Sequence, residues 1–259
     1  MNLFKKEEPK QYESNGHHTR FFLILICLLV SAGLSAQNLT KRTYEGALDG
    51  KIPIVLTLTQ DGSSLFGTVV YKKKGIPITA VGSLTDGNMF LRELMNDGRV
   101  TGLYSLEPQG KGWTGTWGDL KRKGKDYKVT LREIAETTVQ KKKLPNLTGT
   151  YAYAYPEDGG TGSISVLQTE PGKITIDVDA VRGGPSYNMA EIGKTNIPLK
   201  GNKAIYENNE YGKCKLQFTF GENVLEVDYL DEAYECGFGN GASAAGSYVR
   251  TKASQPTFE

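Results

Sequence analysis

The strongest constraint on this chain is a series of short segments in which apolar and polar residues alternate. Near residues 52–60, for example, Ile52, Ile54, Leu56 and Leu58 share one face of an extended chain. Asp-Gly pairs follow several segments and favour tight hairpin turns, because the central residues of such turns take positive φ. The 3.6-residue period of an amphipathic helix does not compete with this pattern. The sequence therefore predicts an all-β fold built from antiparallel hairpins.

The alternating segments fall into two series of eight. Even spacing and short connections predict two consecutive antiparallel meanders that close into barrel-like domains, because closure leaves no exposed edge strand. One continuous β-sandwich is the alternative. Strands are expected near 42–46, 52–60, 64–72, 76–84, 88–95, 99–105, 112–118 and 126–134, and then near 147–155, 161–169, 173–180, 187–193, 196–207, 213–220, 223–230 and 245–250.

A change of composition divides the two series. Residues 136–147 break the alternation and contain three consecutive lysines and a proline, as a short linker does. We therefore expect an N-terminal β domain at 37–135, a C-terminal β domain at 148–253 and a tail at 254–259. Both domains fall within the usual size range of single domains.

The N-terminal segment has the features of a secretion signal. An apolar run from Phe21 to Ala36 is short for a stable membrane span and ends in small residues, as a signal-peptidase site does. We expect a signal peptide at 1–36 with cleavage between Ala36 and Gln37. Cleavage after Gly33 and an uncleaved anchor are the alternatives. After cleavage the protein is expected to be periplasmic or secreted, with no stable membrane span.

Loss of this signal would remove every histidine, because His17 and His18 both precede the apolar run. Nucleophilic triads need an imidazole base, and zinc held by carboxylates alone is unusual. We therefore expect no enzyme activity, no cofactor and no metal site. The net charge of +2 for the full chain also gives no field that would attract nucleic acid.

Two cysteines remain after cleavage, Cys214 and Cys236. In an exported chain such a pair favours a disulfide. The bridge would close a loop of about 23 residues, worth on the order of 3 kcal/mol in the chain-entropy model. A redox or nucleophilic role is disfavoured, because no histidine or Cys-x-x-Cys spacing lowers a thiol pKa.

Paired carboxylates leave one enzyme class open, because glycoside hydrolysis needs only two of them. Asp177 and Asp179 share one face of a predicted strand, about 7 Å apart, although alternating acids usually form the wet face of a sheet. Calcium at the loop 156–159 or at a second acidic cluster is a further alternative, but neither matches EF-hand spacing. The second cluster comprises Asp228, Asp231, Glu232 and Glu235.

Aromatic and basic residues provide candidate contacts for a ligand. Trp113 and Trp117 share one face of a predicted strand, where they either pack in the core or form a stacking platform for a sugar or peptide. The basic runs at 72–74, 121–123 and 141–143 are expected to be solvated turns that discourage edge pairing. Binding of anionic envelope polymers is the alternative for these runs.

Several motifs suggest a relationship to known modules. The second half contains Gly149-Thr150-Tyr151, Cys214-x-Leu216-x-Phe218, Glu235-Cys236-Gly237-Phe238-Gly239 and Gly246-x-Tyr248, and the first half contains Tyr44-x-Gly46 and Gly115-Thr116-Trp117. These motifs resemble uncharacterised exported β modules of Gram-negative envelope proteins. Both halves are also distantly similar to periplasmic β-barrel proteins that inhibit lysozymes by filling the enzyme's cleft with a Ser-Gly-x-x-Tyr-type loop. Residues 182–187 contain similar residue types in a different order.

We therefore expect an exported, non-catalytic binding protein of the bacterial cell envelope with a protein or glycan ligand. One alternative is an inhibitor of a lysozyme-like hydrolase, in which Arg182 and Ser186 would donate to catalytic carboxylates. The other is a carboxylate-only glycoside hydrolase. The candidate ligand contacts are Trp113, Trp117, Arg182, Ser186 and Tyr187.

Overall fold

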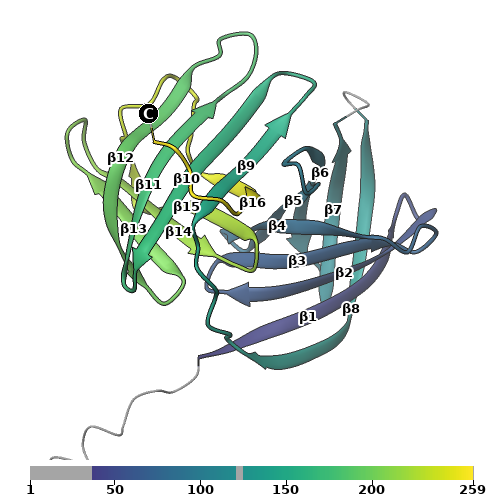
Figure 1. Ribbon diagram of the computed structural model, residues 1–259. Coiled ribbons are helices and arrows are strands. Elements are labelled where there is room, and N and C mark those ends of the chain that lie inside the picture. Colours follow the sequence, from purple (N-terminus) through teal and green to yellow (C-terminus); the bar gives the residue numbers. More distant parts are fainter. Residues whose placement is uncertain (1–36, 121–124, 259) are drawn as a thin grey trace, which may run out of the picture. The chain divides into compact units, whose positions relative to one another are not determined.

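The computed structural model describes residues 37–120 and 125–258, which form two consecutive closed barrels (Figure 1). Each barrel has eight antiparallel strands, so the prediction of an all-β fold with two barrel-like domains is confirmed. Both barrels belong to one compact unit, Asn38–Glu259. The predicted signal peptide, with Ala36, lies outside the described residues, which begin at Gln37. Within the described part of the chain, no helix is long and apolar enough to cross a membrane.

Barrel 1 is an up-and-down meander in which each strand pairs with the next and β8 pairs back with β1. Its strands are β1 (Asn38–Leu48), β2 (Ile52–Asp61), β3 (Ser64–Tyr71), β4 (Pro77–Thr85), β5 (Asn88–Leu94), β6 (Val100–Pro108), β7 (Gly112–Asp119) and β8 (Asp126–Gln140).

Barrel 2 repeats this topology, and β16 pairs back with β9 to close it. Its strands are β9 (Gly149–Tyr155), β10 (Gly160–Glu170), β11 (Lys173–Val181), β12 (Met189–Lys200), β13 (Lys203–Asn208), β14 (Cys214–Phe220), β15 (Val224–Tyr234) and β16 (Gly246–Lys252).

Several strand boundaries differ from the prediction. β1 begins at Asn38 instead of near 42, and β15 continues to Tyr234 instead of ending near 230. β8 continues to Gln140, into the range expected as linker at 136–147, because its last residues pair with the start of β1, from Asn38↔Gln140 onward. β12 continues to Lys200, whereas a break was expected between 193 and 196. The chain turns instead at Gly201, which has a φ of 63°, a conformation that glycine adopts without steric cost.

Inward-facing apolar side chains fill both barrels, as the period of two predicts. Leu56 and Leu58 on β2 are at most 3% exposed, and Phe218 and Phe220 on β14 are fully buried. Burying such side chains contributes about 1.5–3 kcal/mol each before conformational entropy is counted. The disulfide between Cys214 and Cys236, with a sequence separation of 22, ties the start of β14 to the segment after β15, as predicted.

One carboxylate also faces the interior of barrel 1. Glu93 on β5 is 1% exposed and accepts hydrogen bonds from the hydroxyls of Tyr71 at 2.6 Å and Tyr104 at 2.8 Å. Burial raises the pKa of Glu93, as expected for a carboxylate removed from water. Its two tyrosine donors satisfy the buried group, so Glu93 acts as part of the barrel core.

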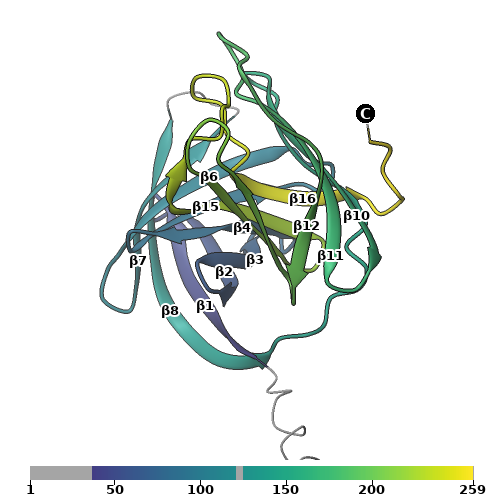
Figure 2. The same ribbon diagram turned by 90° about the vertical axis from the view of Figure 1, so that its left-hand side faces the viewer.

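The outer faces of β15 and β16 pack against β3, β4 and β5 of barrel 1, and Figure 2 shows β15, β16 and β4 as neighbours. Ser247 on β16 donates to the carbonyl of Val81 on β4 at 3.1 Å. At a second contact, the Ala154 N–H donates to the carbonyl of Gly98 at 2.9 Å, beside an isolated parallel bridge between Arg99 and Ala154. This bridge extends β9 beyond its register with β16, which covers only 150–152.

Candidate functional site

The two tryptophans of the predicted stacking platform lie on the inward face of barrel 1. Trp117 is 9% exposed, and its ring centroid lies 5.4 Å from that of Tyr127. Trp113 packs against the same core with part of its surface exposed. Trp117 therefore has no open ring face for a ligand, and the core interpretation describes its position.

The other candidate contacts occupy the loop between β11 and β12. Ser186 is exposed, and Tyr187 is 57% exposed. Arg182 Nη1 donates to the carbonyl of Asn240 at 3.1 Å, and Asn188 Nδ2 donates to the same carbonyl at 2.6 Å. Arg182 therefore anchors the glycine-rich segment after Cys236. The structure brings Arg182, Ser186 and Tyr187 together in one loop, away from the tryptophans in barrel 1.

The acidic residues separate into different environments. Asp231 pairs with Lys215 at 2.8 Å, and Glu235 Oε2 accepts the backbone N–H of Lys213 at 3.0 Å. Asp179 is exposed on the outer face of β11, as the wet-face interpretation expects. No group of three or more His, Cys, Asp or Glu among the described residues is placed to hold a metal ion.

Asp228 has a different position from the rest of its predicted cluster, because it lines a groove between the barrels. This acidic groove has a volume of about 560 Å³ and lies between β4–β8 of barrel 1 and β9, β15 and β16 of barrel 2. Carboxylates, aromatic rings and one guanidinium contribute to its wall. Among the lining residues are Phe90, Arg92, Asp126, Tyr155, Glu226 and Asp228.

Glu226 is the most deeply buried carboxylate in this groove, with 4% of its surface exposed. The inward residues Leu225 and Val227 flank it on β15, so the strand alternation turns Glu226 toward barrel 1. Among the described residues, neither Glu226 Oε2 nor Asp228 Oδ2 has a hydrogen-bond partner. Burial, together with the charge of Asp228, raises the pKa of Glu226 to about 8. Burial also raises the pKa of Asp228.

Arg92 brings a positive charge into the same groove from β5. Its guanidinium carbon lies 5.3 Å from the ring centroid of Tyr153 and 5.9 Å from that of Tyr155, within the range of cation–π contacts. A Cβ at Gly246 would collide with Arg92 Nη1, so glycine is required there for the guanidinium to approach β16. Within the described residues, Nη1 is buried and has no hydrogen-bond acceptor.

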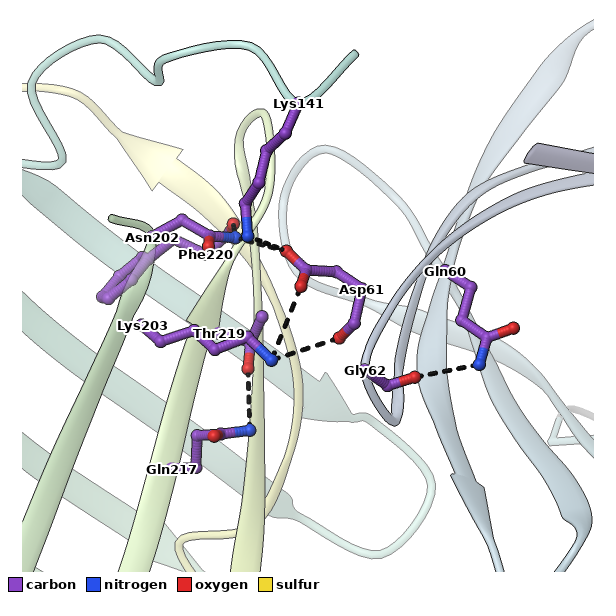
Figure 3. A network of polar contacts seen from close by, with 9 residues as sticks. All are labelled: Gln60, Asp61, Gly62, Lys141, Asn202, Lys203, Gln217, Thr219 and Phe220. Atoms are coloured by element: carbon purple, nitrogen blue, oxygen red, sulfur yellow. Dashed lines mark hydrogen bonds and ion pairs between the residues drawn. The ribbon is translucent and has the colours of Figure 1, made fainter. Parts of the chain in front are cut away.

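A second buried carboxylate between the barrels, Asp61 at the end of β2, has two lysines and an asparagine as partners, although its Oδ1 accepts no hydrogen bond among the described residues (Figure 3). It is 2% exposed, and Asp61 Oδ2 lies 2.7 Å from Lys141 Nζ and accepts from Asn202 Nδ2 at 2.9 Å. Lys203 Nζ lies 3.5 Å from Oδ1. Burial alone would raise the pKa of Asp61, but the hydrogen bonds and charges of these partners leave it lowered.

The structure describes two of the three basic runs that were expected to be solvated turns, 72–74 and 141–143. Lys141, directly after β8, pairs with Asp61 instead of standing in a solvated turn. Asn202 and Lys203 of barrel 2 contact the same carboxylate and so connect the barrels. Lys72 in the first run pairs with Glu45 at the surface. The run 121–123 lies outside the described residues.

Sequence reasoning missed Glu226 and Arg92. The one available signal for Glu226 is its position as a single acid within the apolar stretch Val224–Val227. Comparisons of the chain with protein-family models, curated proteins and solved structures found no match.

Proposed function

We propose that this chain is an exported, non-catalytic protein of the bacterial cell envelope that binds a glycan in the acidic groove. The observation that carries the proposal is the pair of buried acceptors, Glu226 Oε2 and Asp228 Oδ2, which line an open groove and make no hydrogen bond among the described residues, although serine hydroxyls lie beside both carboxyl groups. A buried polar atom without a partner carries a free-energy penalty of about 1–3 kcal/mol. A polar ligand that supplies hydroxyl or amine donors would remove that penalty.

The remaining wall of the groove also suits a sugar. Phe90 is 43% exposed and Tyr155 lines the other side, so both can offer ring surface to the apolar face of a sugar. Hydroxyl groups of Ser83 and Ser105 lie on the same wall and can donate or accept. Convergent polar groups among apolar surface are typical of small-ligand sites. The disulfide supports export, because such bonds persist in oxidising compartments.

The test is direct binding of oligosaccharides from bacterial envelopes to the chain without residues 1–36, by glycan array followed by calorimetry. We expect Phe90→Ala to weaken binding at least 10-fold. The matched control is Tyr187→Ala, which removes an exposed ring from the loop between β11 and β12 and should leave the affinity unchanged. Loss of binding in the Tyr187 variant alone would move the site to the barrel end, and no binding across the array would overturn the proposal.

A carboxylate-only glycoside hydrolase is the second candidate, favoured by one observation. Glu226 and Asp228 share the outward face of β15 and both line the groove, at a strand spacing of about 7 Å. The pKa of about 8 for Glu226 suits a general acid, which must hold its proton at neutral pH. Release of reducing ends from a bound glycan, lost in Glu226→Gln, would establish this activity. Bound but uncleaved glycan would support the binding function.

A further inference from the structure

The charges around the acidic groove are unbalanced. The groove contains the carboxyl groups of Asp126, Glu226 and Asp228 against the single guanidinium of Arg92. A smaller pocket of about 240 Å³ shares Asp126 and Tyr155 with the groove and continues it. That pocket adds three acidic side chains and one cation, from Asp119, Glu157, Asp158 and Lys125. Several like charges lining one cleft attract ligands of the opposite sign.

Glu226 is the acidic residue of the groove with the least exposed surface, so it lies deepest in the groove. A sugar hydroxyl can donate one hydrogen bond to Oε2, whereas an ammonium group offers three donors and a full positive charge. In a buried site a charge-assisted hydrogen bond is about twice as strong as a neutral one. Glu226 Oε2 and Asp228 Oδ2, which make no hydrogen bond among the described residues, offer two acceptors to the three donors of an ammonium group.

The groups that face Glu226 leave this place open to a cation. Arg92 approaches from β5 and its charge partly offsets the raised pKa of Glu226, while its guanidinium stacks over the rings of Tyr153 and Tyr155 on β9. On β16, Ser247 pairs directly with Glu226, and its hydroxyl partly offsets the raised pKa of Glu226 but donates to the carbonyl of Val81 at 3.1 Å. Arg92 Nη1 has no acceptor among the described residues, and a hydroxyl or ring oxygen of the same ligand would provide one.

We propose that the ligand of the acidic groove carries a free amino group, as a de-N-acetylated amino sugar does, and that Glu226 binds its ammonium with the help of Asp228. This inference rests on the proposed glycan-binding function and specifies the class of glycan. Arg92 then contacts a hydroxyl or ring oxygen of the same sugar. Neutral and N-acetylated sugars lack the charge and bind more weakly.

The experiment compares two trisaccharides that differ only in the amino groups, glucosamine trimer and its fully N-acetylated form, by calorimetry at pH 7. We expect the free amine to bind at least 10-fold more tightly. We also expect it to release close to one proton, since Glu226 with a pKa of about 8 is protonated before the cation arrives. Buffers of different ionisation enthalpy measure that proton, and the N-acetylated trimer should release none.

Two variants complete the design. Glu226→Gln keeps the shape of the side chain and should abolish both the preference and the proton release. Glu222→Gln, an exposed acid beyond the groove, should preserve both. Equal affinity for the two trimers, or a preference that survives in Glu226→Gln, would overturn the amino-sugar inference and leave the glycan-binding proposal standing. Absence of binding to these trimers and to every other glycan would overturn both.

Discussion

Asp61 and Glu226 are both buried carboxylates between the same two barrels, with 2% and 4% of their surfaces exposed. Asp61 is held by Lys141, Lys203 and Asn202, and its pKa is lowered. One oxygen of each carboxylate lacks a hydrogen bond among the described residues. Lys203 Nζ lies 3.5 Å from that oxygen of Asp61, whereas burial raises the pKa of Glu226 to about 8. Two carboxylates that are buried to a similar extent therefore have pKa values shifted in opposite directions, because their neighbours differ. Asp61, with lysine partners, connects the barrels, whereas Glu226, with an oxygen open to the groove, is the group on which the proposed ligand site rests.

The largest effect that tests this contrast is the pH dependence of stability at Glu226. Its folded pKa lies above the ordinary value of 4.5, so the folded state holds an extra proton between these values. Stability should therefore fall as the pH rises from about 4.5 to 8. The full difference between the two values corresponds to roughly 5 kcal/mol.

Glu226→Gln should remove most of this decline and raise stability above pH 8, measured by urea unfolding at several pH values. Asp228 and Glu93 have pKa values raised by burial and should leave a smaller residual slope. An unchanged slope in the variant would contradict the raised pKa that burial gives Glu226.

Asp61→Ala should have the opposite sign and lower stability by about 3 kcal/mol, because it leaves the half-buried Lys141 and Lys203 and the buried amide of Asn202 without their carboxylate. Denaturant unfolding at pH 7 measures the loss. Asp179→Ala removes an exposed acid from β11 and should change stability by less than about 0.5 kcal/mol. If both variants lost the same small amount, the network in Figure 3 would not hold the barrels together.

Removal of the disulfide tests whether the raised pKa of Glu226 depends only on its immediate surroundings or on the stability of barrel 2 as a whole. Replacing both Cys214 and Cys236 by alanine should lower stability by about 3 kcal/mol and leave the pH slope from Glu226 intact. The bridge lies at the start of β14 and after β15, and neither cysteine lines the acidic groove. Loss of the slope in this variant would show that the state of Glu226 depends on the whole of barrel 2.

The smallest effect is expected at Arg182, an exposed donor to the carbonyl of Asn240. Arg182→Ala should lower global stability by less than about 1 kcal/mol but speed amide exchange in the segment 237–242. Hydrogen exchange followed by mass spectrometry resolves the two effects. A loss of stability as large as that of Asp61→Ala would contradict the expectation that an exposed contact such as Arg182–Asn240 contributes less than the buried contacts of Asp61.

The features that could be predicted from the sequence are those that depend on local residue patterns. Alternation and Asp-Gly turns identified nearly every strand, and the cysteine count identified the disulfide, because each needs only neighbouring residues or a simple tally. The end of β8 was missed because its last residues are stabilised by pairing with β1. The site was missed for a related reason. Asp61 and Asn202 are 141 residues apart, and no local pattern shows that two barrel surfaces will bury Glu226.

The bridge between Arg99 and Ala154 has a consequence for the separate production of the barrels. β9 loses its register with β16 after residue 152, and Gly98 takes up the next backbone N–H. Barrel 2 cut away from barrel 1 would expose that N–H and the adjoining strand edge to solvent. Open edges of this kind recruit strands from other molecules. The isolated half is therefore an aggregation hazard, and expression should keep the tandem intact.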